Sequence, residues 1–196
     1  MVRSIPRVSA IVVVVLSFSI AGCAPVADPA ASPSAELSPS VSVTPSAQPE
    51  PDLTLPTCDS MFSAELVSAL GTEGLVLQPD NRFVGPSTFD AVLSVVISLS
   101  ESVTCTWVLP NSDTGFTTTV AIVSSTERSD LAAALSAPEF TASAALGGEL
   151  YSYEYNGEGT YFTESHVIVG DVSVSTTYGS GVAEPLTLDA AGQVLP

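Results

Sequence analysis

The sequence predicts an α+β domain built on an antiparallel β-sheet, with two or three helices packed on one face. Segments rich in β-branched and aromatic residues follow one another over 104–123 and 150–178 and do not alternate with helices. Glycine- and asparagine-containing turns separate these segments, and apolar residues at helical spacing occur in three other places. Consecutive strands with helices elsewhere in the chain are typical of an antiparallel sheet in the α+β class.

The first half of the domain contains two helical patterns and one short strand pattern. Residues Ser60–Leu70 carry apolar side chains at helical spacing and stop at Gly71, which suits a left-handed helix cap. Leu75–Gln78 is expected to form a short strand. Phe89–Ile97 shows a helical stripe behind Ser87 as N-cap, although its last residues, from Val95 on, also fit a strand.

The second half is expected to be mostly strands. Residues 104–109 and 116–123 flank the turn sequence of 111–115 and predict a hairpin, and the Ala- and Leu-rich segment 129–137 predicts a helix. Four further strands are expected at Leu150–Tyr155, Thr160–Glu164, Val167–Val169 and Val172–Tyr178. The pattern predicts no element for residues 179–196.

Residues 1–22 have the pattern of a secretory signal peptide. Arg3 and Arg7 form a short positive region, and the apolar run from Ala10 to Ile20 follows it. A helix of this run would cover roughly 17 Å, too little to cross a hydrocarbon core of about 30 Å. The segment is therefore expected to direct export and not to anchor the chain by itself.

The end of this segment, Ile20-Ala21-Gly22-Cys23, resembles the lipobox of bacterial lipoproteins, with Ile20 in place of the usual Leu. The resemblance implies that Cys23 receives a lipid and becomes the mature N-terminus, on the outer face of the cytoplasmic membrane. The membrane would then be a partner through that lipid. The alternative is an ordinary cleavage site near Cys23 and a protein secreted without a lipid.

Residues 24–56 are expected to form a disordered, extended linker after Cys23. Eight of these 33 residues are proline, and none is aromatic. Removal of residues 1–22 leaves Arg82 and Arg128 against all 21 acidic residues, so anionic phospholipid should repel the mature chain. The folded domain, expected over 57–196, would be held away from the membrane surface.

Two cysteines remain for the domain if Cys23 carries a lipid. In an exported chain Cys58 and Cys105 are expected to form a disulfide, which would stabilise the domain by about 4 kcal/mol. A metal or redox pair is the alternative, but it lacks Cys-x-x-Cys spacing and histidine partners. Trp107 shares a strand face with Cys105 and is expected in the core, with a ligand platform as the alternative.

These features together resemble small actinobacterial lipoproteins of uncharacterised function. The matching residues are Cys58 before a first helix that ends at Gly71, and Cys105 and Trp107 on a strand that opens a hairpin. A lipobox and a Pro- and Ser-rich linker precede them. The resemblance implies the location and the disulfide, and it carries no activity that could be transferred.

The residue types exclude several chemistries. There are 21 Asp and Glu residues, four Arg and no Lys, with a formal net charge of −17. Lysine-based catalysis is excluded, and nucleic acid is not expected as a partner. His166 is the sole histidine, lies in no catalytic motif, and is expected to be a partly exposed structural residue. No catalytic residue, metal site or cofactor is predicted.

Tyr151, Tyr153 and Tyr155 alternate and are expected on one strand face, either as ordinary sheet packing or as a stacking platform for sugars or a partner. The leading hypothesis is a non-enzymatic, lipid-anchored binding or accessory protein of the cell envelope, with an envelope protein or cell-wall component as partner. One alternative is a cell-wall glycan hydrolase that uses two carboxylates. Another is an extracytoplasmic sensor or inhibitor domain.

Overall fold

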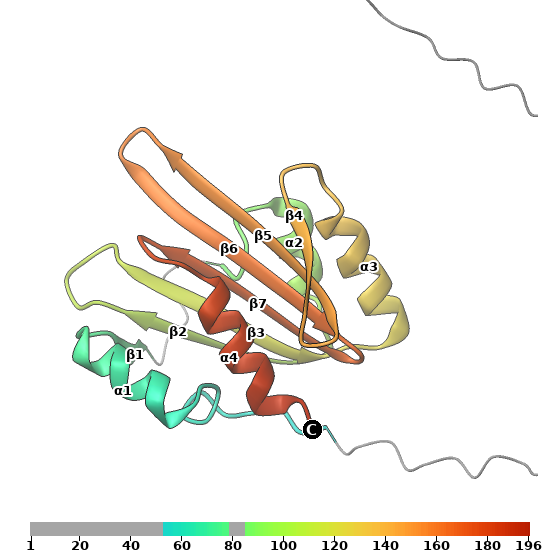
Figure 1. The fold of residues 1–196 in the computed structure, drawn as a ribbon, viewed down its shortest axis with the longest axis horizontal. Helices are drawn as coiled ribbons and strands as arrows, with labels where there is room; N and C mark the ends of the chain where they lie inside the picture. Colours follow the sequence, from blue (N-terminus) through green and yellow to red (C-terminus); the bar gives the residue numbers. More distant parts are fainter. Residues whose placement is uncertain (1–52, 79–84) are drawn as a thin grey trace, which may run out of the picture. The chain divides into compact units, whose positions relative to one another are not determined.

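An antiparallel sheet forms the centre of the fold. In residues 53–78 and 85–196, which the computed structural model describes, seven strands pair in the order β1-β2-β3-β7-β6-β5-β4 (Figure 1). Their bounds are β1 Val76–Gln78, β2 Glu101–Val108, β3 Gly115–Ile122, β4 Thr141–Ala145, β5 Gly148–Gly157, β6 Thr160–Val169 and β7 Val172–Gly179. The predicted α+β class with an antiparallel sheet is confirmed. The predictions for the signal peptide, for Cys23 and for the linker up to residue 52 lie outside the described residues.

Within the part of the chain that the structure describes, four helices cover both faces of this sheet, whereas the sequence predicted two or three helices on one face. Their bounds are α1 Ala64–Thr72, α2 Asp90–Val96, α3 Ser125–Leu135 and α4 Glu184–Val194. Helices α1 and α4 pack over one face in a first core cluster, and α2 and α3 pack over the other face in a second. Successive residues of β6 place apolar side chains on opposite faces of the sheet: Val167 faces the first cluster and Ile168 faces the second. Both faces therefore need a cover. None of the helices in the described residues is long and apolar enough to cross a membrane.

Helix α4 is the largest element that the sequence did not predict. Its buried side chains are small or spaced by polar residues, and they include Leu186, Ala190 and Val194. Its N-cap, Ala183, makes no side-chain cap hydrogen bond, so the N-cap signal is missing, and only Glu184 and Pro185 in the first turn mark the helix start. Asp189 of α4 accepts hydrogen bonds from the backbone N–H and the hydroxyl of Ser63 at 2.8 and 2.7 Å. This contact joins α4 to the start of α1.

Several element boundaries differ from the prediction. Gly71 lies inside α1, and the left-handed residue after the helix is Gly74, with a φ of 84°. Strand β6 is continuous where two strands were expected, and β4 was not predicted. Helix α3 begins at Ser125, because Ser124 and Glu127 form a capping box. Leu53 and Leu55 pack against the first core cluster, so the folded part includes residues before 57.

The predicted disulfide between Cys58 and Cys105 is confirmed. Their Cα atoms lie 5.5 Å apart, and the bridge links residues 47 positions apart in the sequence. Cys105 is fully buried in the first core cluster. Trp107 packs in the same cluster, edge-on to Phe62 and stacked against Phe116, both with ring centroids at 6.4 Å. The bridge thus ties the segment before α1 to β2, the strand next to the edge strand β1.

Candidate functional site

Five aromatic side chains form a chain of ring contacts on the α2 and α3 side of the sheet. We call them the aromatic strip: Phe89, Phe140, Tyr153, Tyr155 and Phe162. Phe89 lies 4.8 Å from both Phe140 and Tyr153 between ring centroids, and Tyr153 lies 5.9 Å from Phe162. Tyr155 and Phe162 stack at 5.2 Å with an interplanar angle of 23°. All five side chains are partly exposed, so the strip is a surface feature that extends from the second core cluster.

Strand register and helix geometry bring these rings together. Tyr155 is directly opposite Phe162 in the pairing of β5 with β6. Such cross-strand neighbours have their side chains on the same face, which accounts for the stacked pair. Phe89 is the residue before α2, and Phe140 is the residue before β4. The strip is therefore assembled from four segments, of which only the one that carries Phe89 lies far from the others in the sequence.

The stacked pair lies near the free end of the β5–β6 hairpin, which extends past its neighbours (Figure 1). The pairing of β4 with β5 reaches only Ser152, and the pairing of β7 with β6 ends at Phe162. Among the strands of the described residues, none pairs with the end of the hairpin beyond these positions. Tyr155 and Phe162 are thus presented where a large partner can approach them.

The three alternating tyrosines lie on one strand face, but they differ in exposure. Tyr151 is buried at 7% exposure and belongs to the second core cluster. Its hydroxyl donates a hydrogen bond to Glu149 at 3.0 Å, and burial, with Glu149 beside it, raises the pKa of Tyr151. Tyr153 and Tyr155 remain partly exposed. The tyrosine face is therefore core at one end and accessible surface at the other.

A buried carboxylate lies directly beneath the strip. Glu164 on β6 is 1% exposed, and its two oxygens accept hydrogen bonds from three neighbours. Ser87 Oγ donates at 2.8 Å, the Thr88 N–H donates at 2.6 Å, and the Thr88 hydroxyl donates to the same oxygen as that N–H. Burial by itself raises the pKa of Glu164, but the hydrogen bonds from His166, Thr88 and Ser87 outweigh it, so the pKa is lowered. Glu164 is therefore a carboxylate and holds the chain before α2 against β6.

His166 is fully buried, contrary to the expectation of a partly exposed residue. Its Nε2 lies 3.2 Å from Glu164 Oε2, and its ring meets Phe140 edge-on at 5.5 Å. Its Nδ1 makes no hydrogen bond within the described residues. Because neither ring nitrogen reaches the surface, His166 cannot exchange a proton with a bound substrate in this conformation. The Glu164–His166 pair positions Ser87, Thr88 and Phe140, and through them it supports the strip.

Phe89, Phe140, Phe162 and Glu164 were not singled out as site residues from the sequence. The sequence did contain a signal for Phe162 and Glu164. They alternate with His166 along one segment, so the three side chains share a strand face. Dividing this segment into two strands concealed that alternation. Phe89 and Phe140 had no such signal, since their place in the strip depends on how α2 and β4 pack.

Two exposed carboxylates and the buried Glu164 line a pocket of about 240 Å³, which Tyr153 of the aromatic strip also lines. Glu154 is on β5 and Glu184 begins α4, with Ser152 and Thr163 also lining the pocket. This arrangement brings together residue types that a carboxylate-based hydrolase requires. Within the described residues, no group of three His, Cys, Asp or Glu side chains is arranged to hold a metal ion.

No protein-family model, no curated protein sequence and no solved structure matches this chain.

Proposed function

We propose that this chain is a lipid-anchored protein of the bacterial cell envelope whose folded domain is a non-enzymatic binding module. In this proposal, Cys23 carries the lipid at the outer face of the cytoplasmic membrane. The aromatic strip binds an envelope protein. The observation that carries the proposal is the stacked pair of Tyr155 and Phe162, partly exposed near the free end of a projecting hairpin.

Aromatic side chains suit such a role because they contribute large contact areas with few rotatable bonds. The strip also rests on an ordered base, since the buried Glu164 and His166 pack beneath it and β5 pairs with β6 from Glu149 to Gly157. A surface held in this way loses little conformational entropy when a partner binds. The disulfide between Cys58 and Cys105 supports an oxidising compartment outside the cytoplasm.

Crosslinking in intact cells followed by affinity capture tests this proposal. The wild-type chain is compared with Tyr155→Ala, with Cys23→Ala and with Tyr161→Ala as a matched control. Tyr161 is a partly exposed tyrosine of the same hairpin whose side chain points to the opposite face. We expect one envelope protein to be captured at high yield with the wild type and Tyr161→Ala, and to be lost with Tyr155→Ala.

The other outcomes have distinct meanings. Loss with Cys23→Ala alone shows that anchoring matters but that the strip does not, which overturns the role of Tyr155. If Tyr155→Ala and Tyr161→Ala reduce capture of the partner equally, the hairpin is damaged as a whole, and the result no longer supports the aromatic strip as the binding site. Capture of wall glycan in place of a protein overturns the protein partner and assigns the strip to sugar rings.

A glycan hydrolase is a second candidate, favoured by the two carboxylates of the 240 Å³ pocket. In this alternative Glu154 and Glu184 act on cell-wall glycan as a pair. Incubation of the protein with purified wall glycan, followed by measurement of released reducing ends, tests it. Release by the wild type that is lost in both Glu154→Gln and Glu184→Gln would establish the hydrolase, and absence of release would remove it.

A further inference from the structure

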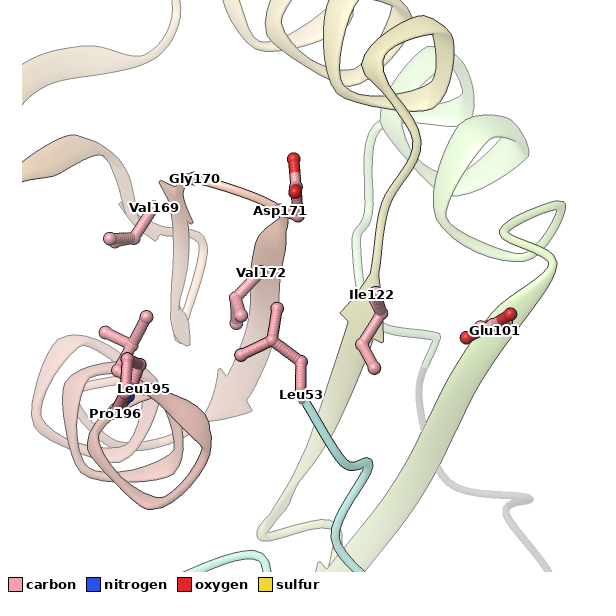
Figure 2. A pocket seen from close by; sticks show the side chains of 9 residues that line it. All are labelled: Leu53, Glu101, Ile122, Val169, Gly170, Asp171, Val172, Leu195 and Pro196. Atoms are coloured by element: carbon pink, nitrogen blue, oxygen red, sulfur yellow. The ribbon is translucent and has the colours of Figure 1, made fainter. Parts of the chain in front are cut away.

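A second pocket, distant in the fold from the aromatic strip, has a different chemical character. It has a volume of about 560 Å³, within the range of small-molecule sites. Its walls are mostly aliphatic: Leu53, Ile122, Val169, Val172, Leu195 and Pro196. We call it the aliphatic pocket. Figure 2 shows side chains of the segment before α1, of β3, of the β6–β7 turn region and of the end of α4 around one space.

The residues of the pocket are only partly covered by the fold. Val172 is buried, whereas Leu53, Ile122 and Leu195 are partly exposed. These side chains come from the end of the domain where α4 and β3 both terminate, and no further helix or strand of the described residues covers them. Aliphatic surface that lines a concave space of this size can be removed from water by a ligand with an aliphatic body.

The rim of the pocket is negatively charged. Glu101 and Asp171 line it, and an adjoining hollow of about 440 Å³ shares both residues and adds Glu127. Arg128 pairs with Asp171 at 2.9 Å, and no other arginine or lysine in residues 53–78 and 85–196 faces these three carboxylates. Glu127 is bound by serine donors, and Glu101 makes no hydrogen bond or ion pair within the described part of the chain. The excess negative charge favours a cationic ligand.

We propose that the aliphatic pocket binds a small molecule with an aliphatic body and a cationic nitrogen. The aliphatic body lies against Ile122, Val172 and Leu195, and the nitrogen lies at the rim beside Glu101. This inference goes beyond the proposed function and does not depend on it. The pocket is on the α4 side of the sheet, whereas the aromatic strip is on the α2 and α3 side.

Titration calorimetry with three probes of equal chain length tests the proposal: octylammonium, octanol and octanoate. The full chain carrying Cys23→Ala is used, so that the expected lipid does not interfere. We expect octylammonium to bind most tightly and octanoate least. Amide signals of Ile122 and Gly170 should shift in the NMR spectrum when octylammonium binds.

Two variants locate the binding. Glu101→Gln should weaken octylammonium about two- to fivefold and leave octanol unchanged, the size expected for an exposed ion pair. Ile122→Ala should weaken all three probes about threefold or more, because it removes aliphatic contact. Glu139→Gln, an exposed carboxylate outside both hollows, is the matched control and should change nothing. Tyr155→Ala should also leave octylammonium binding unchanged.

Three results would overturn the proposal. The first is the absence of measurable octylammonium binding to a protein with an unchanged melting temperature. The second is equal affinity for the three probes, which would leave the rim without a role. The third is a set of amide shifts confined to another part of the sheet. If the first result is obtained and a basic peptide binds instead, the aliphatic pocket is assigned to a protein partner and not to a small cation.

Discussion

Glu164 and His166 lie two residues apart on β6 and meet inside the protein, where Glu164 Oε2 is 3.2 Å from His166 Nε2. Both side chains are fully excluded from solvent. A buried carboxylate with four donors around it is satisfied only while every donor stays in place. This pair therefore links the strand, the start of α2 and the aromatic strip into one unit.

Replacing Glu164 with Gln should destabilise the domain strongly. The Gln amide group presents donors where Ser87, Thr88 and His166 also donate, so at least one buried contact becomes unfavourable. We expect the free energy of unfolding to fall by about 3 kcal/mol, as measured by urea denaturation. The control is Glu154→Gln, at an exposed position on the neighbouring strand β5. It should change the free energy of unfolding by about 0.5 kcal/mol or less. Equal stability of Glu164→Gln and wild type would show that the network is not needed.

Stability should fall in acid, and Glu127 should account for part of that fall. Hydrogen bonds from Ser124 and Ser100 lower the pKa of Glu127 from 4.5 to about 2. A lowered folded-state pKa stabilises the protein above the unfolded pKa, and the stabilisation is lost as pH falls from 4.5 to about 2. The difference in urea midpoint between the wild type and Glu127→Gln should therefore be constant near neutral pH. It should shrink as the pH falls from 4.5 to about 2. A gap that widens in acid would contradict the assignment.

Removing the disulfide should destabilise the domain without changing the fold. The bridge closes a loop between residues 47 positions apart, for which loop entropy predicts a loss of about 4 kcal/mol in the double variant Cys58→Ala and Cys105→Ala. Urea denaturation with and without reductant measures this loss. Reductant should lower the midpoint of the wild type and leave the double variant unaffected. Thiol titration first checks that the reductant has freed both cysteines. If the urea midpoint of the wild type is then unchanged, the disulfide does not contribute to stability.

Substitution of Gly71 tests the position of the α1 end, which differs between the sequence prediction and the structure. A left-handed cap at Gly71 would make alanine destabilising there, but Gly71 lies inside α1 and a Cβ would meet nothing within 4 Å. Gly71→Ala should therefore stabilise the protein by up to about 1 kcal/mol. Gly148→Ala is the contrasting variant, because its Cβ would lie 2.0 Å from the Ile168 carbonyl oxygen, and it should destabilise. Thermal melting compares the two, and a lower melting temperature for Gly71→Ala would contradict the position of the helix.

Much of the strand structure was predictable because its signals are local. The turn residues at 111–115 and 156–159 separate β2 from β3 and β5 from β6, as expected from their turn chemistry. The alternating tyrosines were expected to share a face, and the register of β5 with β6 confirms it. Cys58 and Cys105 were expected to pair because they are the two cysteines left in an exported chain once Cys23 is assigned to the lipid, and the structure confirms the pair. The lipid on Cys23 stays a prediction.

The tertiary structure alone decided which faces the helices cover and which polar residues are buried. The pairing of β3 with β7 joins residues that are 50 to 64 positions apart, and no local pattern specifies such a partner. Packing of the segment before α2 against β5 and β6 likewise joins Ser87 to Glu164 and brings Phe89 to Tyr153, where Phe140 also packs. Helix α4 likewise depends on the first core cluster, because its own apolar pattern is weak. Periodicity and turn chemistry are properties of neighbouring residues, whereas burial and the composition of a site arise from contacts between distant ones.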